Sequence, residues 1–252
     1  MSAGTRPLAR FWPPLARLLG LTLLAVLGLQ LYFAGRIALM ALMAPESTAF
    51  QRSEIWRLVQ QPQGLRWRQT WVPQARISDQ LKRAVIVSED DIFARHEGVQ
   101  WDAMEKAWRQ NARAENQASR TRQSRAPKVV GGSTITQQLA KNLFLSGERT
   151  LLRKGQEFVI TLMLETLLSK RRILEIYLNS VEWGEGVFGA EAAARHYFNK
   201  PASDLNAWEA SRLAVMLPRP RYFEKLPQSP YLQDRADVIQ GRLGSAVLPS
   251  AR

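Results

Sequence analysis

The stretch from Gly131 to Phe144 reads GGSTITQQLAKNLF and predicts the fold of the central part of the chain. Two glycines permit a turn, and Thr134 followed three residues later by Gln137 matches a capping box, which starts a helix. Apolar residues then recur at spacings of three and four, as on one face of a helix. The N–H groups of the first turn remain free, so this helix start is also a potential anion site. An ordinary capped helix without a ligand is the open alternative.

Apolar residues at helical spacing recur along most of the remaining sequence. The expected helices span 101–115, 151–168, 173–178, 190–198 and 208–217. Strand-like alternation is nearly absent, so we expect a mostly α-helical fold. Residues 112–130 are rich in small, polar and basic side chains, which predicts a loop. Its charge fits a solvated face as well as it fits attraction to anionic lipid head groups.

The N-terminal region predicts a membrane anchor. Leu18 to Gly35 contains no charge and spans about 27 Å as a helix. The apolar pattern resumes after Arg36 and continues to Ala44, so we expect a tilted span at 18–44. A cleaved signal peptide would have a shorter apolar region, and a buried core helix would lack the one-sided arginine flank. The positive-inside rule places residues 1–17 in the cytoplasm and the domain 45–252 across the membrane.

Composition excludes several kinds of chemistry. The sequence has 35 Lys and Arg against 22 Asp and Glu, a net charge of +13, with no Cys and two His. Disulfides, thiolate nucleophiles and cysteine-based metal sites are therefore impossible. The basic excess predicts a polyanionic partner. Nucleic acid is the weakest choice, because the domain is expected on the far side of the membrane from DNA.

Two clusters of charged residues are candidates for catalysis. Three acids, Glu89, Asp90 and Asp91, follow an apolar run, and burial beside such a run raises a carboxyl pKa toward the range of a general base. If the segment were helical, Glu89, Phe93 and His96 would share one face. The alternative is an acidic helix end with Phe93 in the core and His96 bonded to a backbone group.

The helix that begins at Thr134 carries polar pairs four residues apart, Gln137 with Lys141 and Gln138 with Asn142. The second charged cluster follows it: Arg149, Arg153 and Glu157 recur every four residues on one helical face. That face is either a ladder of surface ion pairs worth about 0.3–0.5 kcal/mol each, or a cationic clamp for a diphosphate.

Five segments in order resemble a known family. They are Glu89–Gly98, Gly131–Phe144, Arg153–Glu157, Ser169–Asn179 and Gly184–Phe198. Together they cover about residues 75–225 and resemble the glycosyltransferase domain that bacterial peptidoglycan synthases share with class A penicillin-binding proteins. The SxxK serine of the transpeptidase half is missing. The chain is therefore identified as similar to the monofunctional biosynthetic peptidoglycan glycosyltransferases.

The resemblance implies a fold and a site. The fold would be lysozyme-like and helical, with a large lobe and a small membrane-associated jaw lobe. Glu89 would be the catalytic base and Glu157 the second essential carboxylate. Substrate contacts would come from polar and cationic side chains, namely Asp90, Ser133, Thr134, Gln137, Gln138, Lys141, Asn142, Arg149, Arg153 and Lys154. His96 and the glycines of residues 184–189 are expected to be structural.

The resemblance also implies substrates and surroundings. The donor would be a glycan chain on undecaprenyl diphosphate and the acceptor lipid II, in the inner membrane of a bacterium. A divalent cation, Mg²⁺ or Mn²⁺, would assist the leaving group, and no organic cofactor or nucleic acid is expected. Lipids of the inner membrane and other cell-wall synthesis proteins would be further partners. A glycan-cleaving enzyme and a non-enzymatic membrane scaffold are the alternatives.

Overall fold

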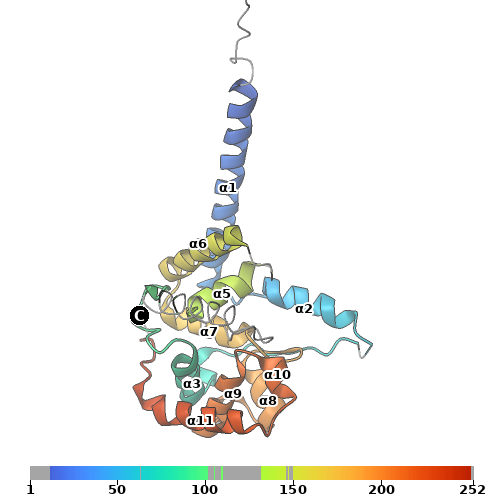
Figure 1. Cartoon of the computed structure of the whole chain (residues 1–252), viewed down its shortest axis with the longest axis vertical. Coiled ribbons are helices and arrows are strands. Elements are labelled where there is room, and N and C mark those ends of the chain that lie inside the picture. The colour runs from blue at the N-terminus through green and yellow to red at the C-terminus, as the bar shows by residue number, and fades with distance from the viewer. Residues whose placement is uncertain are drawn as a thin grey trace, which may run out of the picture.

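The structure is a computed structural model that describes residues 12–62, 64–101, 105, 109, 132–145, 147 and 150–250. Most of the expected helix 101–115 and the whole basic loop 112–130 lie outside these residues. Gly131 and Arg149 lie outside them as well. Figure 1 shows a helical body from which one long helix extends.

The long helix is α1, Trp12–Met40 (Figure 1). Its leucines face outward: Leu18, Leu21 and Leu24 expose 62%, 65% and 65% of their surface. Within the described ranges, Pro14–Met40 alone is long and apolar enough to cross a membrane, judged by length and composition. Exposed leucines along such a helix are what a lipid environment favours. The helix therefore has the form of a single-pass membrane anchor.

The last turns of α1 belong to the body rather than to the anchor. Phe33, Ile37 and Met40 follow helical spacing and are buried in the core. Arg172 donates from Nε to the Met40 carbonyl at 2.7 Å and from Nη2 to the Met43 carbonyl at 2.8 Å. These bonds satisfy carbonyl groups that a helix end leaves without partners. The helix therefore ends at Met40, before the end of the expected span.

The body is mostly α-helical, as the sequence predicts. Its helices are α2 (Ala49–Val59), α3 (Asp79–Glu89), α5 (Ile135–Phe144), α6 (Leu151–Leu167), α7 (Lys170–Ser180), α8 (Ala190–Phe198), α9 (Ala207–Met216), α10 (Pro220–Glu224) and α11 (Pro230–Arg242). Short 3₁₀ turns are η2 (Gln74–Arg76), η3 (Ala202–Asp204) and η4 (Leu243–Ser245). Helices α5 to α9 lie within a few residues of the ranges expected from apolar spacing.

Two groups of helices enclose the core. Helices α3, α9 and α11 pack together, while α5 packs against α2, α6 and α7. The largest fully buried side chains are Trp183, Tyr177, Phe93 and Phe188. Full burial of a large apolar side chain stabilises a fold by about 1.5–3 kcal/mol relative to exposure. This core holds α3 and α5, the two helices that carry most of the expected site.

Three of the described helices begin with a complete capping box. Thr48 caps α2, Thr134 caps α5 and Asn206 caps α9, each in a complete capping box. In α5 the Thr134 hydroxyl accepts from the Gln137 N–H at 3.2 Å, and Gln137 Oε1 accepts from the Thr134 N–H at 3.1 Å. These two bonds confirm the capping box that the sequence predicts at Thr134 and Gln137.

A small sheet lies beside the helices. Its strands are β1 (Arg68–Gln69), β2 (Glu182–Gly184) and β3 (Val187–Phe188), in the order β1-β3-β2. Strand β3 pairs parallel with β1 and antiparallel with β2. Strands of two or three residues are too short to produce a readable alternation of apolar and polar side chains. The sequence therefore predicts no sheet here.

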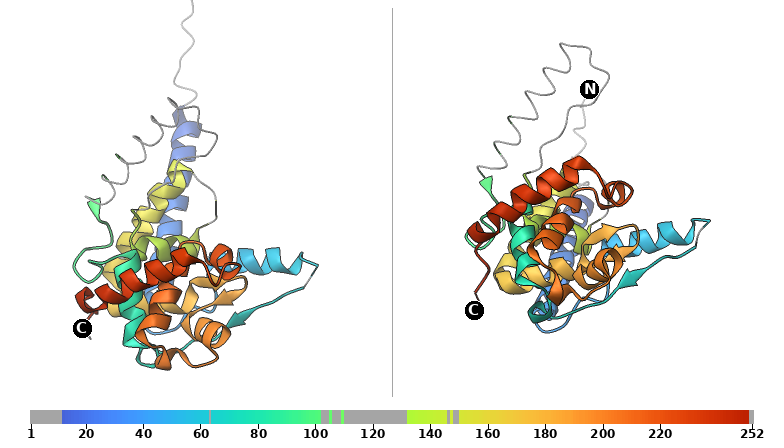
Figure 2. Two further views of the ribbon diagram at one scale, coloured as in Figure 1. Left: turned by 60° about the horizontal axis from the view of Figure 1, so that its bottom comes forward. Right: turned by 90° about the horizontal axis from the view of Figure 1, so that it is seen from below.

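Helix α2 and the chain up to β1, residues 49–69, form an arm that projects sideways from the body (Figures 1 and 2). Arg221 ties this arm to the body, because its guanidinium pairs with Glu54 of α2 at 2.5 Å and with Glu182 of β2 at 2.9 Å. The ring of Phe50 packs edge-on against Phe188, with 6.1 Å between ring centroids. The arm is thus held against the body at its base.

Candidate active site

Glu89 is the last residue of α3 and lies half-buried at the edge of the core. Its Oε2 accepts a hydrogen bond from Gln138 Nε2 at 2.9 Å, and its Oε1 accepts from Ser88 Oγ at 3.4 Å. It borders a cavity of about 260 Å³, which we call the Glu89 cavity. Ser133 from the start of α5 and Arg235 and Arg242 from α11 border the same cavity.

Gln138 is itself held in one orientation. The hydroxyl of the fully buried Tyr177 donates to Gln138 Oε1 at 2.9 Å. The amide nitrogen of Gln138 must then face Glu89, where it donates to the carboxylate. A hydrogen bond donated to a carboxylate favours its charged form. Tyr177, Gln138 and Glu89 therefore form a chain in which each group orients the next.

The surroundings of Glu89 suit a proton acceptor. Burial raises the pKa of Glu89, and the hydrogen bonds from Gln138 and Ser88 act in the opposite direction. The neighbouring charge of Asp90 raises the pKa further, while Arg235 lowers it. A carboxyl group with a raised pKa is a stronger base than a solvated one and works nearer to neutral pH. The prediction for Glu89 thus has a physical basis in this geometry.

Asp90 borders the Glu89 cavity, and its side chain also bonds within the protein. Its expected contact with substrate stays a prediction. The helix ends at Glu89, so residues 90–98 form turns and Glu89, Phe93 and His96 do not share a helical face. The Asp90 side chain is fully buried and accepts from Gln100 Nε2 at 2.5 Å and from the Ile135 N–H at 3.0 Å. These bonds join the end of α3 to the start of α5. Asp90 positions the two helices, and its oxygens are already occupied within the protein.

His96 completes the Asp90 arrangement. The Gly98 N–H donates to Nδ1 of His96 at 2.9 Å, so Nδ1 carries no proton. Nε2 is then the protonated ring nitrogen, and it donates to the Asp90 carboxylate at 2.8 Å. The structural role expected for His96 agrees with these contacts.

The expected substrate contacts of Thr134 and Gln137 are also used internally. Both side chains are buried, and both are engaged in the capping box of α5. The Thr134 hydroxyl in addition donates to the Gly98 carbonyl at 2.6 Å. The family resemblance implied the substrate contacts of these two residues. Thr134 also borders the Glu89 cavity, and both contacts stay predictions.

A second cavity of about 430 Å³, the Lys141 cavity, lies on the other side of Gln138. Lys141 and Asn142 of α5 and Arg153 of α6 border it together with Gln138. Gln138 therefore lies between the two cavities. Its amide nitrogen donates to Glu89, which borders the Glu89 cavity, and its side chain borders the Lys141 cavity. The structure thus brings the expected base and two of the expected cations to neighbouring cavities.

Glu157 lies behind the Lys141 cavity. Its side chain is only 4% exposed and pairs with Arg153 at 3.0 Å and with Lys154. The Nε of Arg153 is buried and has no hydrogen-bond partner among the described residues. Glu157 therefore acts on the cavity through Arg153, which it holds in place. Arg149 falls outside the described residues, so its predicted contact with a diphosphate stays a prediction.

Several side chains at these cavities were not expected from the sequence. Tyr177 lies in the segment Ser169–Asn179, from which no site residue was predicted, and Arg235, Arg242 and Gln100 belong to no motif. No local pattern reveals them, because each reaches the site from another helix or loop. Within the described ranges no group of three or more His, Asp or Glu is placed to hold a metal ion.

Fold and site together define a helical protein with a membrane anchor. At the edge of its core, a half-buried carboxylate lies beside a cation-lined cavity. The family described as Transglycosylase matches residues 57–243. The chain belongs to this transglycosylase family. Proteins named biosynthetic peptidoglycan transglycosylase from Burkholderia thailandensis and Burkholderia pseudomallei are each 53% identical over 228 residues, covering 90% of this chain and 85% of theirs. One from Burkholderia orbicola is 52% identical over 227 residues, covering 90% and 88%.

Proposed function

We propose that this chain polymerises the glycan strands of peptidoglycan from lipid II. It transfers the growing glycan from undecaprenyl diphosphate to the 4-hydroxyl of the acceptor N-acetylglucosamine, and forms a β-1,4 bond with inversion. The family and the names of the relatives support the reaction class. The observation that carries the site is the position of Gln138, which hydrogen-bonds Glu89 and borders the cavity of Lys141 and Arg153.

Glu89 is the proposed base. The acceptor oxygen forms a bond to the anomeric carbon of the donor as its proton passes to the Glu89 carboxylate. The bond from that carbon to the diphosphate breaks, and undecaprenyl diphosphate leaves with the electron pair. Burial, which raises the pKa of Glu89, makes its carboxylate a better proton acceptor. The acceptor sugar would lie in the Glu89 cavity, beside Ser133.

The Lys141 cavity is the proposed place of the donor diphosphate. Lys141, Arg153 and Arg149 would neutralise the charge that develops on the leaving group, so no strong general acid is needed. Glu157 and Lys154 would fix the position of Arg153, and Gln138 and Asn142 would bind donor oxygens. Mg²⁺ or Mn²⁺ would enter bound to the diphosphate itself, since the described residues provide no metal-binding group. No step depends on that ion.

The proposed location is the inner membrane, with the N-terminus in the cytoplasm and residues 45–252 in the periplasm. The arginines that precede α1 support this orientation. Leu151 and Leu152 begin α6, which packs along α1, and they expose 93% and 87% of their surface. Their exposure supports contact of this part of the body with lipid. Other cell-wall synthesis proteins are proposed partners.

The test is purified full-length protein with labelled lipid II in detergent, with and without Mg²⁺, and products sized on a gel. We expect long glycan chains and released undecaprenyl diphosphate. Glu89→Gln should retain lipid II binding and lose polymer formation by a factor of about 10²–10⁴, the usual contribution of a general base. Polymer formation by this variant at the wild-type rate would remove Glu89 from the mechanism. Cleavage of glycan without elongation would instead support a glycan-cleaving enzyme.

A further inference from the structure

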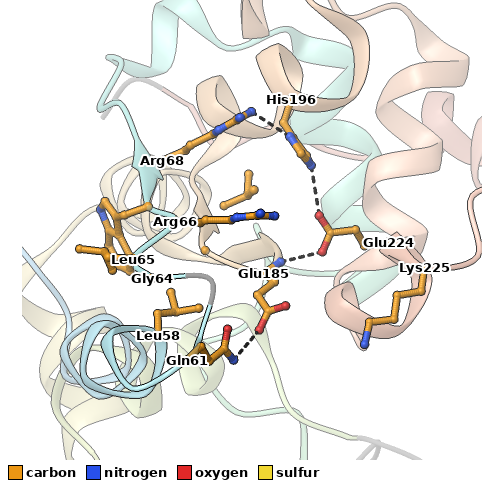
Figure 3. A pocket seen from close by; sticks show the side chains of 13 residues that line it. Leu58, Gln61, Gly64, Leu65, Arg66, Arg68, Glu185, His196, Glu224 and Lys225 are labelled. Carbon is orange, nitrogen blue, oxygen red and sulfur yellow. Dashed lines mark hydrogen bonds and ion pairs between the residues drawn. The ribbon is translucent and has the colours of Figure 1, made fainter.

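A third cavity of about 800 Å³ lies where the arm meets the body, away from Glu89 (Figure 3). We call it the Arg66 cavity. It lies between the end of α2, the loop before β1, the turn between β2 and β3, and helices α8 and α10. Its volume is within the range of ligand-binding cavities. None of the side chains proposed for the reaction borders it.

Gly186, which the catalytic mechanism does not use, shapes this cavity. Gly186 has φ +73°, and a Cβ there would lie 2.0 Å from the Arg66 carbonyl oxygen. The Gly186 carbonyl accepts from the Arg68 N–H at 2.8 Å. Only glycine permits this close approach of the two backbones. Gly186 therefore holds the segment with Arg66 and Arg68 against the cavity.

Three cations border the cavity: Arg66, Arg68 and Lys225. All three are exposed, and none forms an ion pair with any residue in the part of the chain that the structure describes. Figure 3 shows the Arg66 side chain extending into the space between the arm and α10. Arg68 donates to Nδ1 of His196 at 3.0 Å, a neutral acceptor that leaves its charge uncompensated.

The two acids at this cavity already have donors. Glu185 accepts from Arg57 at 3.0 Å and from Gln61 at 3.1 Å. Glu224 accepts from His196 Nε2 at 3.1 Å and from the Glu185 N–H at 2.8 Å. Each carboxylate is thus held to the wall, as the dashed lines of Figure 3 show. The charge left for a ligand is positive, which favours an anion.

The remaining wall is apolar. Leu58, Leu65, Trp67 and Val187 border the cavity, and the Trp67 ring stacks on Phe188 with 4.4 Å between centroids. A ligand that fills this cavity therefore carries carboxylates together with apolar groups. A short peptide with free carboxylates has this combination, whereas inorganic phosphate would leave the apolar wall without contacts.

The Arg66 cavity lies alongside the Lys141 cavity. Three elements contribute to both: α2 and the residues just after it, β2 with its turn, and α10 with the residues beside it. Glu185 borders the Arg66 cavity and Glu182 borders the Lys141 cavity, a separation of about 10 Å along an extended chain. Arg221, paired with Glu54 and Glu182, lies between them. A polymer that leaves the Lys141 cavity past this bridge comes within reach of Arg66.

We propose that the Arg66 cavity binds the peptide side chain of the elongating glycan strand through its carboxylates. This inference rests on the proposed function, in which the donor strand occupies the Lys141 cavity. Each disaccharide of such a strand carries a peptide with free carboxylates. A contact remote from the reacting bond retains the strand after undecaprenyl diphosphate leaves, so that further units are added before the strand dissociates.

The test is the double variant Arg66→Ala/Lys225→Ala of the full-length protein. Product length is compared with wild type at equal consumption of lipid II. We expect the mean chain length to fall about fivefold, which corresponds to about 1 kcal/mol of strand binding. Arg66→Lys should retain most of the length, because it keeps the charge. Arg76→Ala, which removes an exposed arginine of η2 elsewhere, is the matched control and should leave the length unchanged.

A second experiment uses lipid II whose peptide carboxylates are amidated. Wild-type protein should then make short chains, and the double variant should shorten them no further. Wild-type chain length from the double variant with ordinary lipid II would overturn the inference, and would direct attention to an acidic protein partner instead. Equal lengths from amidated and ordinary lipid II with wild type would also overturn it. If wild-type protein made no polymer in either experiment, that result would contradict the proposed function itself.

Discussion

The hydroxyl of Tyr177 on α7 lies 2.9 Å from the amide oxygen of Gln138 on α5, and this contact determines which end of that amide faces Glu89. A phenol hydroxyl donates here, so the oxygen of Gln138 is occupied and its nitrogen remains for the carboxylate. The orientation favours the ionised form of Glu89, the form that can accept a proton. Tyr177 is therefore a positioning residue for the proposed base.

We predict that Tyr177→Phe moves the acid limb of kcat/KM to higher pH. The released amide can rotate and place its oxygen next to Glu89, which favours the protonated carboxyl and raises its pKa. The base is active only when ionised, so activity is lost at the acidic end and retained at the alkaline end. We expect a loss of about tenfold at low pH, corresponding to about 1.5 kcal/mol for a hydrogen bond to a charged group.

The matched control is Tyr197→Phe, which removes the hydroxyl of a half-buried tyrosine, bonded to the Trp183 carbonyl at 2.9 Å and away from Glu89. It should cost similar stability and leave the pH profile unchanged. The other groups acting on Glu89 are Ser88 and Asp90 beside it and Arg235 on α11, and neither variant alters them. Identical acid limbs for Tyr177→Phe and wild type would contradict the positioning role.

We predict that Glu89→Gln makes the fold more stable at neutral pH. Burial raises the pKa of Glu89 in the folded state, so the folded protein binds this proton more tightly than the unfolded chain does. The free energy of unfolding therefore falls as pH rises from the unfolded pKa through the folded pKa. Glutamine has no such dependence. Thermal unfolding should show a Tm a few degrees above wild type at pH 7.

The same comparison supplies its own check at acidic pH. Below the ordinary carboxyl pKa of about 4.3, Glu89 is protonated in both states and the difference in Tm should disappear. The exposed Glu97 is the matched control, and Glu97→Gln should leave Tm unchanged at both pH values. A Glu89→Gln variant less stable than wild type at pH 7 would show that the carboxylate does not strain the fold.

We predict that Arg153→Ala lowers both donor affinity and stability. It removes a cation from the Lys141 cavity and leaves the buried Glu157 with Lys154 as its remaining ion-pair partner. An incompletely paired buried group costs about 1–3 kcal/mol. Steady-state kinetics with lipid II should show a raised KM, and thermal unfolding a lowered Tm. Arg153→Lys should fall between Ala and wild type, because it keeps the charge but not the planar fork.

Lys154→Ala separates the two effects of Arg153. Lys154 pairs with the same Glu157, but its side chain is 47% exposed and does not border the Lys141 cavity. We expect a smaller change in Tm and little change in KM. A larger rise in KM for Lys154→Ala than for Arg153→Ala would show that Lys154, rather than Arg153, contacts the diphosphate.

The helices and the charged faces of the site were predictable because their signals are local. The capping box of Thr134 and Gln137 and the spacing of four between Arg153 and Glu157 appear in the structure as hydrogen bonds and an ion pair. Local signals do not show which polar atoms are already bonded within the protein, as those of Thr134 and Gln137 are in the capping box of α5. The sequence leaves open whether the helix continues past Glu89, because the contacts that Asp90 makes with α5 cannot be seen in the local pattern.

Contacts between distant segments could not be predicted from the sequence alone. Tyr177 and Gln138 are 39 residues apart, and neither segment contains a pattern that indicates their hydrogen bond. Arg66 and Gly186 meet only through a parallel pairing of two-residue strands. Such pairs depend on how whole helices pack, so a single sequence reveals the residue types but not their partners.

A pair of glutamines joins the anchor to the body. Gln30 of α1 and Gln156 of α6 exchange two amide hydrogen bonds, of 3.0 and 3.1 Å. Removing one partner leaves the other amide unsatisfied in surroundings that are lipid or apolar protein, whereas removing both leaves no polar group behind. Gln156→Leu alone should therefore lower the Tm of the detergent-solubilised protein more than Gln30→Leu/Gln156→Leu does. The double-mutant cycle should give a coupling of about 0.6–1.7 kcal/mol. Additive losses would show that the two amides do not stabilise each other, and that Phe33, Ile37 and Arg172 hold the anchor without them.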